Sequence, residues 1–510
     1  MRGSPIVQEA LLFGALALLV RVLPATLVAN LSPDAVEYLN IGQHLARGDG
    51  LVLSIKFHYF NSLPVVHSAL ADRPPLYPLL VGLLWALWQS QAVVQLASAA
   101  LGALNVLLLY LMARQAYGWR AARLAAAALV VTPPMFGTSL LPWSEQLSLV
   151  WVLLALWLYQ GYLRRPWVVP AIGILCALAY LTRQASMAVL VCLLVLLWLD
   201  TRRWSEMALA LASFALALAP LAVVNLLQGR GPLASSQQYH FVVARFTEGM
   251  WWGFSRQYPT PWGFIAAHPL VVAGGVLWNL GTYILNLVWW LAGVLPALPR
   301  LVAKGSRLWA TRNALIIAAG TLVLHSLVWS TTDAFRFMLV PVVVLLPPLA
   351  AGLLTWVRGL RRRHPHRSRW AYGIALFLLL GLFSADVVRV NVSAILVYLR
   401  QGRMVAPALV GPPENLGRWL GQNTPAGAVV AAVNPWMPAY LSHRPAVLLP
   451  VNLTGEQLQR FLAQYQVEVV VVDTQDPLLR PQVPTYLETL EAVGSEQATF
   501  GHLVIFSIYP

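Results

Sequence analysis

The stretch LLFGALALLVRVLPATLVANLSPDAVEYLNIG, residues 11–42, joins an apolar run directly to a polar segment that carries Asp34 and Glu37. The apolar part belongs to a run over residues 9–30, which is long enough to cross the roughly 30 Å of bilayer hydrocarbon as a helix. The whole chain of 510 residues has only 19 Asp and Glu residues, so two acids three positions apart are unusual in this sequence and indicate a specific role. The stretch predicts a membrane helix that is followed at once by a segment with a task outside the hydrocarbon.

The composition of the chain excludes an ordinary soluble domain. Hydrophobic residues make up 59% and charged residues 10%, whereas a soluble domain carries roughly 25% charged residues. We therefore predict a mainly α, polytopic bundle of about eleven transmembrane helices. The apolar runs that predict them are 9–30, 93–113, 122–140, 145–163, 167–182, 186–200, 206–227, 270–298, 311–330, 337–357 and 370–388.

The basic residues predict the orientation of this bundle. They cluster in every second connection, which is the positive-inside pattern if the N-terminus is cytoplasmic. The clusters are Arg114, Arg120 and Arg123; Arg164 and Arg165; Arg202 and Arg203; Arg300, Lys304, Arg307 and Arg312; and residues 358–369. We thus expect a multi-pass protein of the cell membrane with its C-terminal part outside. An anionic-lipid or nucleic-acid patch is the alternative for the last cluster, and we expect no nucleic-acid partner.

Two domains are predicted. Residues 1–390 form the transmembrane domain, with long extracytoplasmic connections at 31–92 and 228–269. Residues 411–510 form a small extracytoplasmic α/β domain, because apolar runs there shorten to strand length. In that domain ENLGRWLGQ and TGEQLQRFLAQY predict helices, the second capped by Thr454, and AVVAAV and VEVVVVD predict buried strands.

The acidic segment reads as a short helix. Ser32 followed by Pro33 is a helix start, and the helix is expected to run to about Arg47, before Gly48. A spacing of three places Asp34 and Glu37 on one face near the positive end of the helix. The alternative to a catalytic role is that an acid in a first turn simply stabilises the helix.

Three arginines and one further acid lie close to predicted membrane boundaries. Arg73 precedes two prolines in RPPLYP, which favours a fixed guanidinium suited to phosphate, with an interfacial anchor as the alternative. Arg336 lies where a span begins, and Arg183 lies between two spans with hardly any loop. Charges so close to hydrocarbon usually have a partner. Glu145, at the mouth of another span, is a candidate partner for Arg183 in a structural ion pair.

Several motifs, taken in order, resemble those of the integral-membrane glycosyltransferases with the C-type fold. They are DAVEYLNIGQHLARGDG, RPPLYPLLVGLLW, LLYLMARQAYG, SLLPWSEQLSLVWVLLAL, LAYLTRQASMAVL and AFRFMLVPVVVLL. The group most similar is the prokaryotic set related to protein O-mannosyltransferases and to the aminoarabinose transferases of lipid A. The resemblance covers residues 9–388, and RWLGQNTPAGAVVAA and AYLSHRPAV resemble the extracytoplasmic domains found in that group.

This resemblance implies transfer of a sugar from a polyprenyl-phosphate carrier to a hydroxyl acceptor on a protein, lipid or polysaccharide, at the extracytoplasmic membrane face. It implies that Asp34 is the catalytic carboxylate, that Arg73 binds the carrier phosphate and that Arg336 matches the basic residue of a late motif. Many relatives have adjacent acids at the first position, whereas here Ala35 follows Asp34 and the second catalytic candidate is Glu37. The remaining substrate-binding candidates are Arg183, Glu145, Tyr77, His240 and Arg256.

The sequence leaves alternatives on two further points, the binding of a metal ion and the rival function of a transporter. His58 and His67, with Glu37 or Asp72, are candidates for a divalent metal site, although isolated loop histidines more often serve as hydrogen-bonding residues. The sequence names no other cofactor, and beyond the donor and acceptor the expected partners are membrane lipids. The main rival function is a transporter or lipid flippase. Transporters usually place polar residues at mid-membrane, whereas the acids and arginines here gather at one face.

Overall fold

The computed structural model describes residues 5–27, 31–163, 165–239, 260–291, 306–328, 334–363, 373, 382–401 and 412–508. Contacts within the chain divide it into two compact units. The helical unit comprises Met1–Val28, Gln91–Ala234 and Leu270–Gly402, and the mixed unit comprises Ala29–Ser90, Ser235–Pro269 and Arg403–Pro510. The first long connection and the C-terminal residues therefore belong to the same unit.

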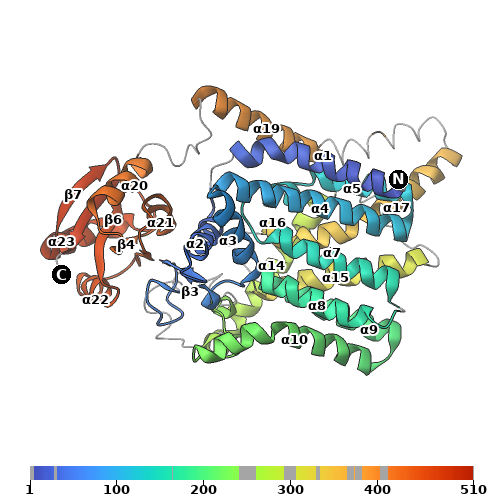
Figure 1. Ribbon diagram of the computed structural model, residues 1–510, viewed down its shortest axis with the longest axis horizontal. Helices are drawn as coiled ribbons and strands as arrows, with labels where there is room; N and C mark the ends of the chain where they lie inside the picture. Colours follow the sequence, from blue (N-terminus) through green and yellow to red (C-terminus); the bar gives the residue numbers. More distant parts are fainter. Residues whose placement is uncertain are drawn as a thin grey trace. The chain divides into compact units, whose positions relative to one another are not determined.

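The helical unit is a bundle in which helices far apart in sequence run side by side (Figure 1). Its elements are α1 (Pro5–Leu27), α4 (Gln91–Tyr117), α5 (Trp119–Val131), α6 (Pro133–Thr138), α7 (Glu145–Tyr162), α8 (Val168–Thr182), the 3₁₀ helix η2 (Gln184–Ser186), α9 (Met187–Thr201), α10 (Trp204–Leu227), α14 (Pro269–Trp290), α15 (Ser306–Val328), α16 (Ala334–Phe337), α17 (Leu339–Arg363) and α19 (Leu382–Gln401). Their shared core is apolar, and leucines on the outer faces of α1, α10 and α14 are exposed, as expected where a helix faces lipid.

Seven helices of the described residues are long and apolar enough to cross a membrane: Ile6–Thr26, Gln91–Tyr117, Gln184–Thr201, Trp204–Leu227, Pro269–Trp289, Leu308–Leu327 and Leu339–Gly359. The chain is a multi-pass membrane protein, as its composition predicted. The total of eleven spans stays a prediction. The expected run 122–140 is divided at Thr132, because the proline that follows disfavours a helical conformation there. The expected run 370–388 lies mostly outside the described residues.

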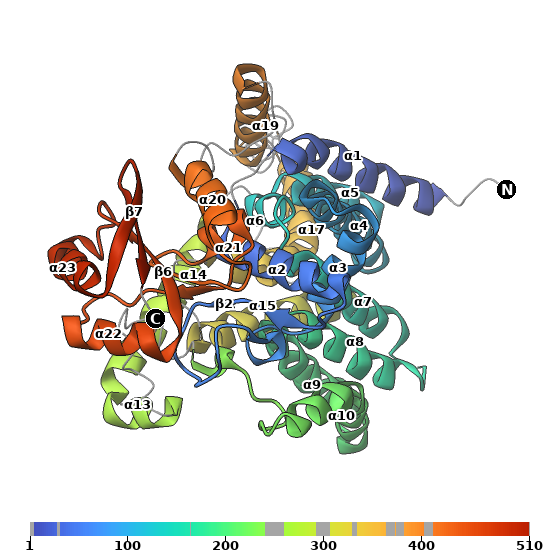
Figure 2. The same cartoon turned by 60° about the vertical axis from the view of Figure 1, so that its left-hand side comes forward.

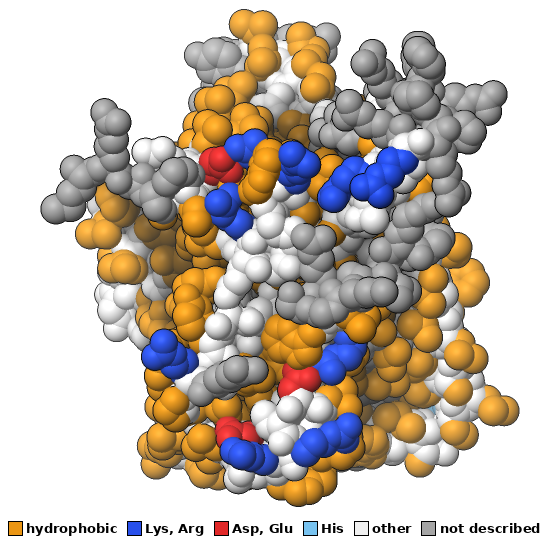
Figure 3. All heavy atoms as spheres, turned by 90° about the vertical axis from the view of Figure 1, so that its right-hand side faces the viewer, with side chains coloured by type: hydrophobic (Ala, Val, Ile, Leu, Met, Phe, Trp, Pro, Cys, Tyr) orange, Lys and Arg blue, Asp and Glu red, His pale blue; other side chains and the backbone are white. Residues whose placement is uncertain are grey.

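One end of the helical unit gathers basic side chains. Glu9 on α1 accepts a hydrogen bond from Arg123 Nε on α5 at 3.2 Å and pairs with Arg114 on α4 at 3.9 Å. At the same end, Asp200 on α9 binds Arg312 on α15, and Tyr117 on α4 bonds to Thr311 at 3.2 Å. Figure 3 looks onto this end and shows Lys and Arg side chains among exposed hydrophobic ones. Arg114, Arg123 and Arg312, which belong to two of the predicted basic connections, thus lie at one end of the bundle.

The mixed unit combines the first long connection with the C-terminal α/β region. The connection contributes α2 (Pro33–Arg47), β1 (Val52–Leu53), β2 (Ile55–Lys56), β3 (His67–Ser68), the 3₁₀ helix η1 (Ala69–Ala71) and α3 (Leu76–Trp88). The second connection contributes the 3₁₀ helix η3 (Ser236–Tyr239) and α13 (Pro261–Ala267). The C-terminal region contributes α20 (Pro412–Asn423), β4 (Val429–Ala432), α21 (Trp436–Ser442), β5 (Ala446–Leu448), α22 (Gly455–Gln464), β6 (Val467–Asp473), the 3₁₀ helix η9 (Arg480–Gln482), α23 (Val483–Val493), β7 (Gly494–Phe500) and β8 (Leu503–Ile508).

A six-stranded sheet organises this unit, with strand order β2-β5-β4-β6-β8-β7. The first four strands are parallel, and β8 and β7 join antiparallel. Alternate residues of β6 face opposite sides: Val470 and Val472 pack with α22 and α23, whereas Val469 and Val471 pack with α20. Figure 2 shows these helices beside the strands of the sheet. The sheet is therefore covered on both faces.

The four C-terminal elements predicted from the sequence are confirmed as α20, β4, α22 and β6. Thr454 caps α22 in a reciprocal capping box with Gln457. The sequence did not predict that the first connection would supply a strand of this sheet. Ile55 of β2 pairs with Ala446 of β5 in parallel register. A two-residue strand leaves too short an alternating pattern to recognise, so only the fold reveals it.

Candidate active site

The helix α2 carries the two acids of the opening stretch. Ser32 caps it by accepting a hydrogen bond from the Ala35 N–H at 3.3 Å, and Gly48 ends it in the left-handed conformation at φ 90°. Both boundaries agree with the sequence-based prediction. A helix this short is held mainly by packing, and α2 packs closely on α3. A Cβ on Gly42 would lie 2.5 Å from Val81, and one on Gly82 would lie 2.8 Å from Leu45.

The close approach of α2 and α3 brings Arg73, three residues before α3, onto both carboxylates of α2. Arg73 Nη2 lies 2.5 Å from Asp34 Oδ1, and Arg73 Nε lies 2.7 Å from Glu37 Oε2. We call these three residues the acid cluster. The side chain of Asp34 is 21% exposed, whereas that of Glu37 is only 1% exposed. The two acids therefore share one arginine but differ in their access to solvent.

Aromatic rings surround the acid cluster. The Arg73 guanidinium carbon lies 5.5 Å from the ring centre of Tyr38 and 5.7 Å from that of Phe57. Tyr77, a predicted substrate-binding residue, is buried and meets the ring of Tyr38 edge-on at 4.8 Å. These contacts hold Arg73 in one orientation, as a planar cation between ring faces prefers. Tyr77 thus contributes to the shell of the cluster rather than to its charge.

The surroundings shift the pKa values of the charged groups in opposite directions. Burial raises the pKa of Glu37 to about 7, against the lowering effect of Arg73, while the charge of Asp34 raises it further. Burial alone would lower the pKa of Arg73, but Asp34 and Glu37 hold it well above its usual value. The arginine therefore stays charged, while Glu37 can gain or lose a proton near neutral pH.

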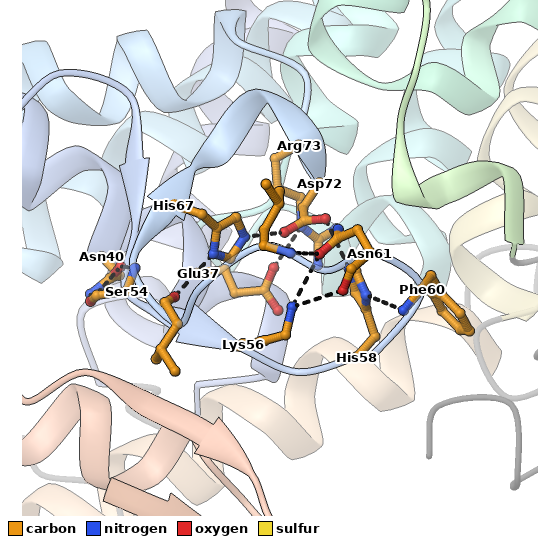
Figure 4. Close-up of polar contacts among 12 residues, drawn as sticks. Glu37, Asn40, Ser54, Lys56, His58, Phe60, Asn61, His67, Asp72 and Arg73 are labelled. Carbon is orange, nitrogen blue, oxygen red and sulfur yellow. Dashed lines mark hydrogen bonds and ion pairs between the residues drawn. The ribbon is translucent and has the colours of Figure 1, made fainter. Parts of the chain in front are cut away.

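The candidate metal residues form a hydrogen-bonded network instead (Figure 4). His58 Nε2 lies 2.8 Å from Asp72 Oδ1, and His67 Nε2 lies 2.6 Å from Asp72 Oδ2. The Nδ1 atom of His58 accepts the Phe60 N–H at 3.3 Å, which assigns the proton of His58 to Nε2. Among the described residues, no group of three or more His, Cys, Asp and Glu side chains is arranged to hold a metal ion.

The charges in this network follow from their environments. Burial would raise the pKa of Asp72, but the hydrogen bonds of His58 and His67 to its two oxygens hold it well below its usual value. Burial lowers the pKa of His58, which agrees with its neutral tautomer. Asp72 directly precedes Arg73 in the chain, so an ionised Asp72 clamped by two histidines fixes the backbone from which Arg73 extends.

A second cluster lies in the helical unit and has the opposite balance of charge. Oε1 of Glu145, at the start of α7, binds both Arg183 Nη1 at 2.7 Å and Arg336 Nε. We call these three residues the arginine cluster. The sequence-based pairing of Glu145 with Arg183 is thus found, and Arg336 joins the same oxygen. Because α7 extends about 27 Å and its other end reaches Asp200 through Tyr159, the arginine cluster lies at the end opposite to the basic one.

A small pocket adjoins the arginine cluster. It is lined by the three cluster residues and by Ser148, Leu149, Ala185, Ser186, Val189, His325, Phe337, Leu339 and Val340. Trp143 packs under the Arg336 guanidinium at 4.4 Å, and Phe337 packs under that of Arg183 at 5.0 Å. Among the described residues that line this pocket there is one carboxylate for two guanidiniums, a composition that favours an anion.

The structure does not describe two of the predicted site residues, and it adds two residues that the sequence did not indicate. His240 and Arg256 lie outside the described residues, so the structure does not bear on them. Sequence reasoning missed Trp436, whose indole N–H donates to Glu37 Oε1 at 2.8 Å, and His325, which lines the pocket beside the arginine cluster. Trp436 lies 399 positions from Glu37, and no local pattern could have joined them.

The chain is similar to one protein family and to several solved structures. Residues 72–226 match the model of a family described as dolichyl-phosphate-mannose-protein mannosyltransferase. None of the curated proteins compared with the chain matches it. Among solved structures, ArnT from Cupriavidus metallidurans bound to undecaprenyl phosphate superposes with a TM-score of 0.61 at 16% identity, covering 98% of each chain.

Two other structures share the fold. The oligosaccharyltransferase AglB from Archaeoglobus fulgidus, in complex with an inhibitory peptide and a dolichol-phosphate, has a TM-score of 0.60 at 13% identity, covering 98% of this chain and 74% of that chain. The arabinofuranosyltransferase AftD from mycobacteria has a TM-score of 0.52 at 15% identity, covering 99% of this chain and 40% of that chain. Such identities establish a shared fold. The fold is that of integral-membrane glycosyltransferases of known structure, and residues 72–226 match a glycosyltransferase family model, in agreement with the resemblance of the motifs.

Proposed function

We propose that this enzyme transfers a sugar from a polyprenyl-phosphate carrier to a hydroxyl acceptor at the extracytoplasmic membrane face, with Asp34 as the general base. The observation that carries the proposal is the acid cluster. One arginine lies on two carboxylates of a short helix, and one of those carboxylates, Asp34, remains accessible. This pairing places a proton acceptor, Asp34, in direct contact with a cation, Arg73.

The proposed reaction is a single displacement. The acceptor oxygen forms a bond to C1 of the sugar, and the bond from C1 to the phosphate oxygen breaks, so the electron pair leaves with the carrier phosphate. Asp34 takes the acceptor proton as the new bond forms. Arg73 stabilises the charge that develops on the leaving phosphate. A single displacement inverts the anomeric centre, and an anomeric assignment of the product tests this point.

The geometry of Arg73 allows it to bind both carboxylates and a phosphate oxygen at the same time. Its Nε and Nη2 atoms bind the carboxylates, and its Nη1 atom makes no hydrogen bond within the described residues. A guanidinium can thus hold the two acids with one edge and offer another nitrogen to a phosphate oxygen. The more exposed Asp34 suits proton transfer, whereas the buried Glu37 suits the positioning of Arg73.

We propose that the arginine cluster binds an anionic part of the substrate as well. Glu145 pairs with both Arg183 and Arg336, and the described lining of their pocket holds two guanidiniums and one carboxylate. The family matched by residues 72–226 is described by its dolichyl-phosphate-mannose donor, and two structures of the same fold hold undecaprenyl phosphate and a dolichol-phosphate. These relatives support a polyprenyl-phosphate carrier for this chain.

The test is release of sugar from a panel of radiolabelled polyprenyl-phosphate sugars by the full-length enzyme in membranes. Wild type is compared with Asp34→Asn, which keeps the shape of the side chain, and with Asp49→Asn as a matched control. Asp49 lies beyond the end of α2, and its side chain is 50% exposed. Turnover that is lost in Asp34→Asn and retained in Asp49→Asn supports the proposal.

Two results would overturn parts of it. Turnover unchanged in Asp34→Asn removes Asp34 from catalysis. Movement of an intact donor between the leaflets of a vesicle, with no sugar released from any donor of the panel, favours the lipid flippase over the transferase.

A further inference from the structure

The first connection and the C-terminal α/β region are built into each other. Strand β2 forms the edge of the C-terminal sheet, and the Ala446 N–H donates to the Ser54 carbonyl at 2.9 Å. Tyr59 donates to the Leu448 carbonyl and is buried among side chains of α22, with Phe461 at 6.0 Å and Tyr465 at 5.7 Å between ring centres. The segment between the two acids and Arg73 therefore packs as part of the C-terminal sheet and its covering helices.

One residue of the C-terminal region reaches the acid cluster directly. Trp436 begins α21, and its Nε1–H donates to Glu37 Oε1 at 2.8 Å. Its ring lies 5.8 Å from that of Phe57, which in turn packs against the Arg73 guanidinium. Trp436 thus meets the cluster twice, once through a hydrogen bond and once through an aromatic neighbour.

The hydrogen bond matters because Trp436 is one of two side chains that donate to Glu37 among the described residues. Its side chain is 1% exposed, and its two oxygens are divided between two donors: Arg73 Nε on Oε2 and Trp436 Nε1 on Oε1. Removing the indole donor leaves a buried carboxylate oxygen without that bond, which disfavours the charged form. Asp34 does not contact Trp436 through any hydrogen bond of the described residues, so the effect is expected at Glu37.

We propose that the C-terminal α/β region completes the active site and that Trp436 is a positioning residue, which holds Glu37 as a carboxylate so that Glu37 holds Arg73. This inference rests on the proposed function, because it assigns a role within the same cluster. It gives the second acid a task different from that of Asp34. It also explains why the edge of an extracytoplasmic sheet is formed by a strand of the first connection.

The proposal predicts a change in the dependence of activity on pH. The charged groups that face Glu37 are Asp34 from α2 and Arg73 from the segment before α3, and Trp436 faces it from α21. The Trp436 hydrogen bond lowers the pKa of Glu37, so its loss raises that pKa. Protonated Glu37 no longer holds Arg73 through an ion pair, and activity therefore falls on the acid side at a higher pH than in the wild type.

The experiment compares Trp436→Phe with wild type and with Trp419→Phe, using donor turnover between about pH 5.5 and 9, a range that brackets the titration of Glu37. Phenylalanine keeps an aromatic ring beside Phe57 and removes only the donor. Trp419 on α20 packs in a different hydrophobic cluster, with Leu416, Val469 and Ile505, and serves as the matched control. We expect the acid limb of Trp436→Phe to shift upward by about one pH unit, with near wild-type turnover at the alkaline end, and the limb of Trp419→Phe to stay in place.

A direct titration keeps the test decisive if turnover is low. The protonated carboxyl band of Glu37, assigned by its absence in Glu37→Gln, is followed by infrared difference spectroscopy of the full chain against pH. An upward shift of its midpoint in Trp436→Phe supports the inference. An unshifted midpoint and limb, with Asp34→Asn inactive, overturns the inference and leaves the proposed function intact, whereas full activity of Asp34→Asn overturns the proposed function.

Discussion

The acid cluster and the arginine cluster are built from the same chemistry in opposite proportion. The acid cluster has two carboxylates and one guanidinium, and the arginine cluster has one carboxylate and two guanidiniums. In each, the side chain in the minority is shared by the other two. Loss of that shared residue leaves two like charges facing each other at low exposure, which is costly.

Their surroundings differ as well. The acid cluster stands on two helices with a hydrogen-bond donor from the C-terminal region, and Glu37 can titrate near neutral pH. The arginine cluster stands where helices of the bundle begin and end, with Trp143 and Phe337 under its two guanidiniums. The comparison teaches that the first cluster is suited to move a proton and the second to hold a fixed anion.

The largest expected effect comes from the shared residue of the acid cluster. Arg73→Gln removes the cation and leaves Asp34 and Glu37 side by side, so we expect sugar transfer to fall by about 10²- to 10³-fold. Arg73→Lys keeps the charge but cannot bind both carboxylates and a phosphate in one plane, and should recover only part of the activity. Initial rates with saturating donor measure both variants. Wild-type rates in Arg73→Gln would remove Arg73 from the reaction.

The next effect concerns stability and the shared residue of the arginine cluster. Glu145→Gln leaves Arg183 and Arg336 without their common carboxylate, and we expect a loss of about 3 kcal/mol. Glu37→Gln removes only one of two acids, since Asp34 still pairs with Arg73, and should cost about 1 kcal/mol at about pH 5, where Glu37 is protonated in the folded protein. Thermal unfolding of the purified variants in one detergent measures the difference. A larger loss in Glu37→Gln would contradict the comparison.

Much of this architecture could be predicted from the sequence, for identifiable reasons. The boundaries of α2 follow from Ser32, Pro33 and Gly48, and its two acids share a face because of their spacing. The Glu145 and Arg183 pair followed from the cost of charge near hydrocarbon. Such inferences need only local patterns or a general physical rule.

What could not be predicted depends on contacts between distant segments. The β2 strand has two residues and exists because β5, far along the chain, offers it an edge. Trp436 looks like any partly buried aromatic until the fold brings it to Glu37. The joining of Arg336 to the same oxygen as Arg183 depends on how three helices pack, which a single sequence does not reveal.

A smaller effect should separate the clusters by pH. The pKa of Glu37 rises from 4.5 in the unfolded chain to about 7 in the folded protein. As the pH rises through this window the unfolded state loses the proton while the folded state keeps it, so Glu37 lowers the free energy of unfolding by about 2 kcal/mol between about pH 5 and 7. The lowered pKa of His58 raises the free energy of unfolding as the pH rises below pH 6.5. This contribution is the same in the wild type and in Glu37→Gln, so it cancels in their difference.

The measurement is therefore a difference. The melting temperature of Glu37→Gln minus that of the wild type is followed between about pH 5 and 8, and it should rise with pH up to about pH 7 and then level off. Glu145→Gln provides the control, because it leaves Glu37 in place and should not reproduce that rise. A difference independent of pH in Glu37→Gln would show that Glu37 does not titrate in this range.

The smallest expected effects come from one hydroxyl near each cluster. Ser32 caps the helix that carries Asp34, and Ser32→Ala should cost about 1 kcal/mol and lower turnover a few-fold, since Asp34 lies in the first turn.

Ser148 lines the pocket of the arginine cluster and bonds to Ser186 at 2.6 Å. Ser148→Ala should raise the KM for the donor a few-fold with little change in kcat, because it alters a binding pocket and leaves the proton acceptor in place. Initial rates over a range of donor concentrations resolve the two parameters. If Ser148→Ala lowers kcat and Ser32→Ala raises KM, the roles assigned to the two clusters must be exchanged.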